Sequence, residues 1–208
     1  MFLSLDGIDG TGKSTQVRLL AEALHGRGLV VTTCADPGGT ELGAKLREIL
    51  LYGRQTSMSL RSECLLFMAS RAELVERVIA PALGRGEIVL ADRYLLANVV
   101  YQGHAGGLTP EDVWTTGRFA TAGILPDLTI VLDLPVDLAR ARRGAAADRV
   151  ERRGDPYFER VRQGFLAEAA RDPRRFRVVD ATPVIAEVQM EIVGIVEEHL
   201  PRSPLPVD

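Results

Sequence analysis

Short runs of apolar residues alternate with amphipathic stretches along most of the chain. Five of the apolar runs are apolar almost throughout or rich in β-branched residues, as buried strands are. These runs cover residues 2–5, 29–33, 87–91, 128–134 and 175–180. Between them apolar residues recur at helical spacing, most clearly over 60–83 and from 184 to about 199. The alternation predicts an α/β fold in which a parallel sheet is covered by helices on both faces, with ligands at the carboxyl ends of the strands.

A glycine-rich loop follows the first predicted strand and precedes an amphipathic run. It reads Gly7-Ile8-Asp9-Gly10-Thr11-Gly12-Lys13-Ser14, followed by Thr15, and has the spacing G-x-x-x-x-G-K-[ST] of a phosphate-binding P-loop. In such a loop the backbone N–H groups point at a phosphate chain, Lys13 reaches the outer phosphates, and Ser14 offers a hydroxyl to Mg²⁺. The sequence therefore predicts that residues 7–15 bind ATP with Mg²⁺. The competing interpretation is a glycine turn that merely caps a helix.

A second polar group follows the buried run 87–91. Asp92 is placed to hold Mg²⁺ beside Ser14, and the alternative is a plain helix N-cap. Arg93 would point into the cleft, where its planar fork can hold the phosphate of an acceptor, and the alternative is a surface arginine.

Arginines crowd a segment of small residues at about 142–156. They are Arg142, Arg143, Arg149, Arg152 and Arg153. The segment predicts a lid that closes on ATP and places a guanidinium on the transferring phosphoryl group. The alternative is a solvated helical face.

Other candidate ligand contacts come from helical runs. Phe67 and Arg71 are four residues apart and share one helix face, where Phe67 could stack on a base and Arg71 bond its edge. Spacing alone favours a core position for Phe67. Tyr101 and Gln102 end an apolar helical run, and their polar tips could meet a sugar or a base.

The composition is that of an ordinary folded protein. With 208 residues and a net charge of -3, we expect a single domain over residues 1–200, followed by a flexible tail at 201–208. Neither a nucleic-acid nor a membrane partner is expected, because the charges are balanced and no apolar run approaches about eighteen residues. Cys34 and Cys64 look like small buried residues, and the chain starts directly in a strand without a basic leader. Both features predict a cytoplasmic location.

Taken together, the motifs resemble those of the thymidylate kinase family, whose members make dTDP from dTMP and ATP. The similarity covers nearly the whole chain and is carried by residues 6–15, 37–40, 65–67 with 71, 92–94 with 101–103, 126–128 and 148–151. The P-loop lacks the basic residue that one branch carries, and basic residues lie in the lid instead, as in the bacterial branch. The resemblance implies a P-loop kinase fold with a five-stranded parallel sheet and a short lid. It also implies a homodimer and a role in dTTP synthesis.

The resemblance also assigns roles to residues. Asp9 would lie near the sugar 3′-hydroxyl, Phe67 would stack on thymine, and Arg71 would bond its edge. Arg93 would hold the acceptor phosphate, while Tyr101 would crowd the ribose 2′ position. The expected substrate-binding residues are Asp9, Phe67, Arg71, Arg93, Asn98, Tyr101 and Gln102. The expected catalytic residues are Lys13, Arg93, Arg149 and Asp9, with Ser14 and Asp92 on the metal.

Three positions depart from the family pattern. The family usually has Glu at Asp6, Arg-Glu at Ala35-Asp36 and Ser at Ala97. All three departures fall on the acceptor side of the predicted cleft. They motivate one alternative, a non-catalytic nucleotide-binding paralogue. A deoxynucleoside kinase, in which Asp36 could serve as base, or another pyrimidine nucleotide kinase also stays open.

Overall fold

The computed structural model describes residues 1–52, 58–143 and 153–200, and its strands form one parallel sheet. The strands are β1 (Phe2–Asp6), β2 (Val31–Ala35), β3 (Ile88–Asp92), β4 (Leu128–Asp133) and β5 (Phe176–Asp180), in the order β2-β3-β1-β4-β5. The predicted five-stranded parallel α/β fold is confirmed. β2 starts at Val31 rather than at residue 29 because Leu29 N–H still donates to Leu24 O, at the end of the preceding helix.

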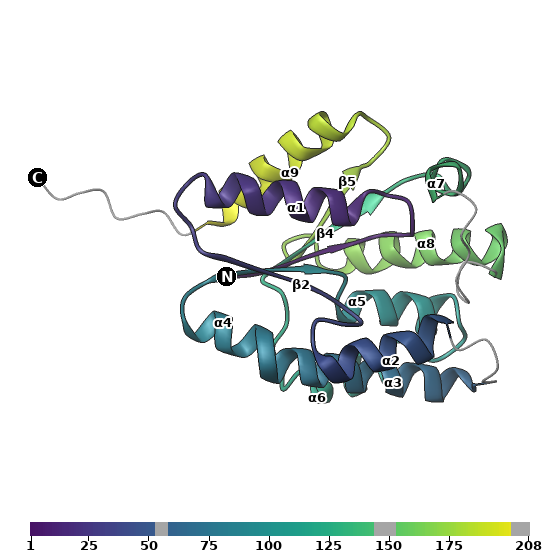
Figure 1. Ribbon diagram of the computed structural model, residues 1–208. Helices are drawn as coiled ribbons and strands as arrows, with labels where there is room; N and C mark the ends of the chain where they lie inside the picture. Colours follow the sequence, from purple (N-terminus) through teal and green to yellow (C-terminus); the bar gives the residue numbers. More distant parts are fainter. Residues whose placement is uncertain (53–57, 144–152, 201–208) are drawn as a thin grey trace, which may run out of the picture.

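Helices cover both faces of the sheet, which gives three layers (Figure 1). On one side lie α1 (Lys13–His25) and α9 (Ile185–His199). On the other side lie α3 (Leu60–Leu74), η1 (Val75–Ile79), α4 (Ala80–Gly84), α5 (Leu95–Asn98), η2 (Val99–His104) and α6 (Pro110–Ala120). The remaining helices are α2 (Glu41–Tyr52), α7 (Val136–Arg143) and α8 (Asp155–Arg171). Among the residues described, no helix is long and apolar enough to cross a membrane.

The long helix expected over residues 60–83 is observed as three consecutive helical elements, α3, η1 and α4. Its middle part is a π-helical turn, after which Ala80 N–H donates to Val75 O. Pro81, in the first turn of α4, has no N–H to donate to the turn before it. The lost donor is a physical reason for a wider turn at this point.

Alternate residues of β1 and β3 belong to two different apolar cores, and the larger core reaches both faces of the sheet at β4, where it includes consecutive residues. Leu3 and Leu90 belong to the core beneath α1 and α9, whereas Phe2 and Val89 belong to the core beneath α3 and α6. Both cysteines are free and buried, as expected. The central strands β1, β3 and β4 are thus buried on both faces, which is why their sequences show runs rather than alternation.

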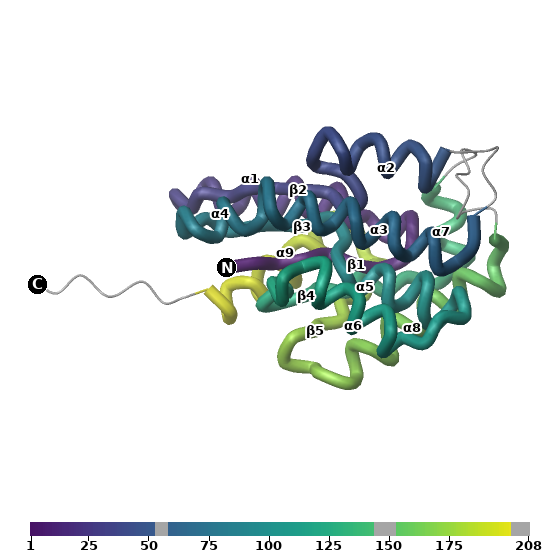
Figure 2. Tube along the Cα trace, turned by 90° about the horizontal axis from the view of Figure 1, so that it is seen from below, coloured from purple at the N-terminus to yellow at the C-terminus, as the bar shows by residue number. Residues whose placement is uncertain are grey.

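The strand register brings three loops to one edge of the sheet. Leu5 is paired with Asp92, and Ala35 with the same Asp92 on the opposite side of β3. The loops that follow β1, β2 and β3 therefore leave the sheet side by side. Beyond them α2 runs along α3 in both views (Figures 1 and 2).

Candidate active site

The P-loop forms the turn between β1 and α1. Gly7, Gly10 and Gly12 have φ values of 140°, 94° and 93°, which residues with a Cβ rarely adopt. Gly10 also has no space for a side chain, because a Cβ there would lie 2.2 Å from the carbonyl oxygen of Ala139. Thr11 Oγ1 donates to Ile8 O at 3.0 Å and closes the loop. The loop is thereby held in a tight curl at the positive N-terminal end of α1, as an anion-binding loop requires.

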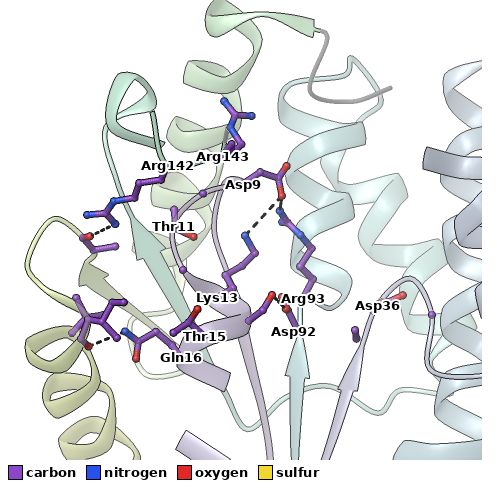
Figure 3. Close-up of a pocket in the computed structure, with 18 of the residues that line it drawn as sticks. Asp9, Thr11, Lys13, Thr15, Gln16, Asp36, Asp92, Arg93, Arg142 and Arg143 are labelled. Atoms are coloured by element: carbon purple, nitrogen blue, oxygen red, sulfur yellow. Dashed lines mark hydrogen bonds and ion pairs between the residues drawn. The ribbon is translucent and has the colours of Figure 1, made fainter. Parts of the chain in front are cut away.

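Lys13, the first residue of α1, bends back over this loop (Figure 3). Its Nζ donates to Ile8 O at 2.8 Å and lies 4.0 Å from Asp9 Oδ1. Burial of the ammonium, together with the nearby charge of Arg93, lowers the pKa of Lys13 to about 8. A phosphate group would relieve both effects, so the side chain is set to bind an anion.

Arg93 follows β3 with a left-handed φ of 69°, a conformation that costs a non-glycine residue roughly 1–2 kcal/mol. The turn directs its side chain to the P-loop (Figure 3). Nη1 donates to Gly7 O at 2.9 Å and Nη2 to Asp9 Oδ1 at 2.5 Å. The guanidinium also lies over the Tyr101 ring, 5.1 Å from its centroid. Strain stored at this position therefore serves to hold a cation at the loop.

Asp9 is the anion between the two cations. Burial opposes its ionisation, but the charges of Arg93 and Lys13 outweigh burial and lower the pKa of Asp9 to about 2. Asp9 is thus charged at neutral pH and orients both side chains. The cluster keeps an excess of positive charge beside the P-loop.

Ser14 and Asp92 lie against each other at the sheet edge, where Ser14 Oγ donates to Asp92 Oδ2. A hydroxyl and a carboxylate are oxygen ligands that suit Mg²⁺, which commonly completes its shell with water and phosphate oxygens. The described ranges contain no group of three or more His, Cys, Asp or Glu side chains able to hold a metal. The pair therefore fits an ion that is shared with a nucleotide.

A large cavity of about 1490 Å³ lies over the P-loop. Its far wall consists of Arg142 and Arg143 from α7 and of the loop after β5 (Figure 3). Arg142 donates to Ala181 O at 2.9 Å and to Thr182 O at 3.3 Å. Arg142 thus braces the cavity wall instead of reaching across it. Arg143, the last residue of α7, lies over the Phe158 ring, 4.5 Å from the centroid.

A second cavity, of about 120 Å³, adjoins the first. All of the residues expected to bind the acceptor line it, namely Asp9, Phe67, Arg71, Arg93, Asn98, Tyr101 and Gln102. Phe67, which spacing alone favoured for the core, is half-buried on this wall. The structure therefore brings side chains from α3, α5, η2 and two loops to one small site.

Arg71 is held by a buried carboxylate. Its Nε donates to Asp36 Oδ2 at 2.5 Å, and both side chains are at most 1% exposed. Burial raises the pKa of the Asp36 carboxyl, against the opposing charge of Arg71. Asp36 therefore lies where it can anchor Arg71.

The other departures from the family pattern lie nearby. Ala97 lines the second cavity. Asp6 is fully buried at the end of β1, and burial outweighs the charges of Arg93 and Lys13 and raises its pKa to about 7. Two of the three departures, Asp36 and Ala97, thus line the cavity wall.

Sequence reasoning missed several residues that line these cavities. Arg47 of α2 lines both cavities and donates to Pro37 O at 2.8 Å. Gln16 lines the first cavity and donates to Ile185 O at 3.0 Å. Gln16 is far in sequence from the loop after β5, so no local pattern in the sequence marks it as a cavity residue. Arg149 and Arg152 lie outside the described residues, as do most of the lid expected at 142–156 and the tail at 201–208.

Comparisons with known proteins agree with this geometry. The family model described as Thymidylate kinase matches residues 5–192. The chain is 45% identical to the thymidylate kinase of Symbiobacterium thermophilum over 97% of its own length and 95% of that protein. It is 45% identical to the thymidylate kinase of Kosmotoga olearia, covering 93% of each chain, and 43% identical to that of Fervidobacterium nodosum, covering 96% and 100%. The chain belongs to the thymidylate kinase family.

Proposed function

We propose that this protein transfers the γ-phosphoryl group of ATP to dTMP. One observation carries the proposal: the two cavities share Asp9, Asp36, Pro37, Arg47 and Arg93. A nucleotide on the P-loop and a second nucleotide in the smaller cavity would therefore meet with their phosphates at the same charged residues. Such an arrangement suits direct in-line transfer between two bound substrates.

The chemistry needs charge neutralisation more than a base. A nucleotide phosphate has its second pKa near ~6, so the attacking oxygen is mostly ionised at neutral pH. Lys13 binds the donor phosphates, and Arg93 holds the acceptor phosphate while Asp9 fixes its orientation. Bound Mg²⁺ would neutralise charge on the donor phosphates, with Ser14 and Asp92 as its protein ligands. The role expected of Arg149, a guanidinium on the transferring group, remains a prediction.

The acceptor base lies between Phe67 and the polar wall. Arg71 is a pure donor, so it favours a carbonyl on the base over an amino group. The side-chain amides of Asn98 and Gln102 form a further part of this wall, and Tyr101 lies beside the sugar of the acceptor. This donor-rich edge supports thymine as the base over cytosine.

The rival deoxynucleoside kinase would need Asp36 as general base. Asp36 is buried and its Oδ2 accepts from Arg71 at 2.5 Å, which favours an anchoring role instead. The non-catalytic paralogue is likewise less supported, because Lys13, Ser14, Asp92 and Arg93 all converge on the P-loop.

The test is ADP production with ATP and Mg²⁺ across dTMP, dUMP, dCMP, dAMP, dGMP, UMP and thymidine. We expect turnover with dTMP far above that with every other acceptor. Preferred turnover of thymidine would instead establish a nucleoside kinase. ATP binding without ADP production for any acceptor would establish the non-catalytic alternative.

We further propose that residues 1–200 act as one domain and that two copies associate through the outer surface of α3 and α6. Leu65 on α3 is 52% exposed and Phe119 on α6 is 90% exposed, and such apolar side chains on adjoining helices suit a self-complementary interface. Phe119→Asp should give a monomer in light scattering. Met190→Asp, at a residue of α9 that is 67% exposed, should stay dimeric. A monomeric wild type, or a dimeric Phe119→Asp variant, would refute this interface.

The cellular location belongs to the same set of proposals. The two buried, unpaired thiols, Cys34 and Cys64, suit a reducing compartment such as the cytoplasm.

A further inference from the structure

A chain of hydrogen bonds leaves the acceptor cavity on the side away from the P-loop. Arg71 Nη2 donates to Asn98 Oδ1 at 2.5 Å. Asn98 Nδ2 donates to Gln102 Oε1 at 2.7 Å, and Gln102 Nε2 donates to Glu63 Oε1 at 2.8 Å. Arg153 Nη2 ends the chain, 3.2 Å from Glu63 Oε1 and 3.1 Å from Oε2. The cavity wall is therefore connected to a residue just before α8.

The two ends of this chain fix the direction of every bond in it. An arginine can only donate, and an ionised carboxylate can only accept. With Arg71 at one end and Glu63 at the other, the amides of Asn98 and Gln102 have one orientation that satisfies all partners. The wall that faces the base thus presents a fixed pattern of donors and acceptors.

Glu63 can end this chain as an ionised acceptor only if a positive charge lies beside it. Its side chain is 3% exposed, and a carboxylate buried to that extent is costly unless it is paired. Arg153, 27% exposed, supplies such a charge to both carboxylate oxygens.

Arg153 reaches a second support of the same wall. Its Nη1 donates to Tyr157 Oη at 2.9 Å, and Tyr157 Oη donates to Tyr101 O at 2.9 Å. The guanidinium also lies over the Tyr157 ring, 4.9 Å from the centroid. Arg153 therefore supports both Tyr101 and Gln102, two consecutive residues of the cavity wall.

We propose that Arg153 is a positioning residue for the acceptor cavity: by pairing with Glu63 it fixes the amides of Gln102 and Asn98 against the base of the acceptor. Arg153 itself lies outside the residues that line either cavity. The inference rests on the proposed function, since the assay below uses dTMP as acceptor.

The test is steady-state kinetics of Arg153→Ala, with KM measured separately for dTMP and ATP. Losing one partner of a half-buried charged pair should raise the KM for dTMP roughly tenfold, with kcat changed by less than about threefold. The KM for ATP should stay at the wild-type value, because the hydrogen bonds that connect Arg71 to Arg153 involve no residue of the P-loop. Arg160→Ala is the matched control: Arg160 also lies near the Tyr157 ring, at 5.7 Å, but is exposed and bonds Pro156 O. It should leave both KM values unchanged.

Rescue separates pairing from a merely structural role. Glu63→Gln replaces the carboxylate with which Arg153 pairs by a neutral amide, so adding it to Arg153→Ala should bring the KM for dTMP back to that of Glu63→Gln alone. An undiminished effect of Arg153→Ala in the Glu63→Gln background would overturn the proposal, as would an unchanged KM for dTMP or an equal rise in the KM for ATP. If Arg153→Ala does not fold, Arg153→Lys keeps the charge without the fork and should still raise the KM for dTMP alone. A wild type inactive on dTMP refutes the proposed function instead.

Discussion

The buried pair of Asp36 and Arg71 offers the sharpest test of the acceptor site. Replacing Asp36 by Ala leaves the guanidinium of Arg71 buried without its carboxylate, since both side chains are at most 1% exposed. Breaking a pair of this kind costs about 3–5 kcal/mol of folding free energy. In a chain of this length each kcal/mol lowers Tm by roughly 2–4 °C. The Asp36→Ala variant should therefore melt roughly 6–20 °C below the wild type.

The matched control is a pair with good geometry and less burial. Arg162 donates to both oxygens of Asp133 at 2.7 and 2.8 Å, with side chains 24% and 21% exposed. Because water still reaches this pair, Asp133→Ala should cost no more than about 1 kcal/mol, or roughly 2–4 °C. The loss of Tm in the two variants, measured by calorimetry, shows whether burial or bond geometry decides how much an ion pair stabilises the fold. Equal losses in the two variants would refute the reasoning.

Activity then distinguishes an anchor from a base. Asp36→Asn keeps an acceptor for Arg71 Nε but cannot take a proton. If Asp36 positions Arg71, this variant should raise the KM for dTMP and keep kcat within about tenfold of the wild type. A general base would instead account for about 10²–10⁴-fold in rate. A fall in kcat of that size at saturating substrate would make Asp36 a base.

Two further predictions concern the P-loop. Gly10→Ala should abolish measurable ATP binding in calorimetry, because φ is 94° and the new Cβ would lie 2.2 Å from Ala139 O; the same change at Gly194 of α9, where a Cβ meets nothing within 4 Å, should leave ATP affinity unchanged. Since the pKa of Lys13 in the free protein is lowered to about 8, its ammonium is lost as pH rises above that value, and ATP affinity should fall between pH 7 and 9.5. Calorimetric titrations with ATP in two buffers of different ionisation enthalpy should show that the protein takes up protons on binding near pH 9. An ATP affinity that does not change over this pH range would contradict the lowered pKa of Lys13.

The fold and the P-loop could be predicted because their causes are local in sequence. Strands that are apolar on both faces appear as continuous runs, and a phosphate loop needs glycines, a lysine and a hydroxyl at fixed spacing. The same logic located Asp92 and Arg93, because both follow a buried strand. The start of β2, which was predicted too early, also has a local cause, since Leu29 N–H donates to Leu24 O in the turn after α1.

The rest of the site depends on contacts between residues that are far apart in sequence. Arg47 and Gln16 line cavities because α2 and α1 pack where they do, and neither carries a distinctive motif. Phe67 shows the limit of periodicity, since a half-buried aromatic on a cavity wall has the same spacing as a core residue. The pairing of Arg153 with Glu63 spans 90 positions, so no local pattern in the sequence could indicate it.

The contacts of Arg93 suit the role proposed for it between two substrates. A guanidinium has five N–H donors, and three of its bonds go to Gly7 O, Asp9 Oδ1 and Tyr101 Oη. Donors therefore remain for an acceptor phosphate while the bond to Asp9 is kept. Because Asp9 also lies beside Lys13, the anion holds both cations at one point in the free protein. The phosphates of two nucleotides would then meet a site whose charges are already in place, so little reorganisation is needed at the moment of transfer.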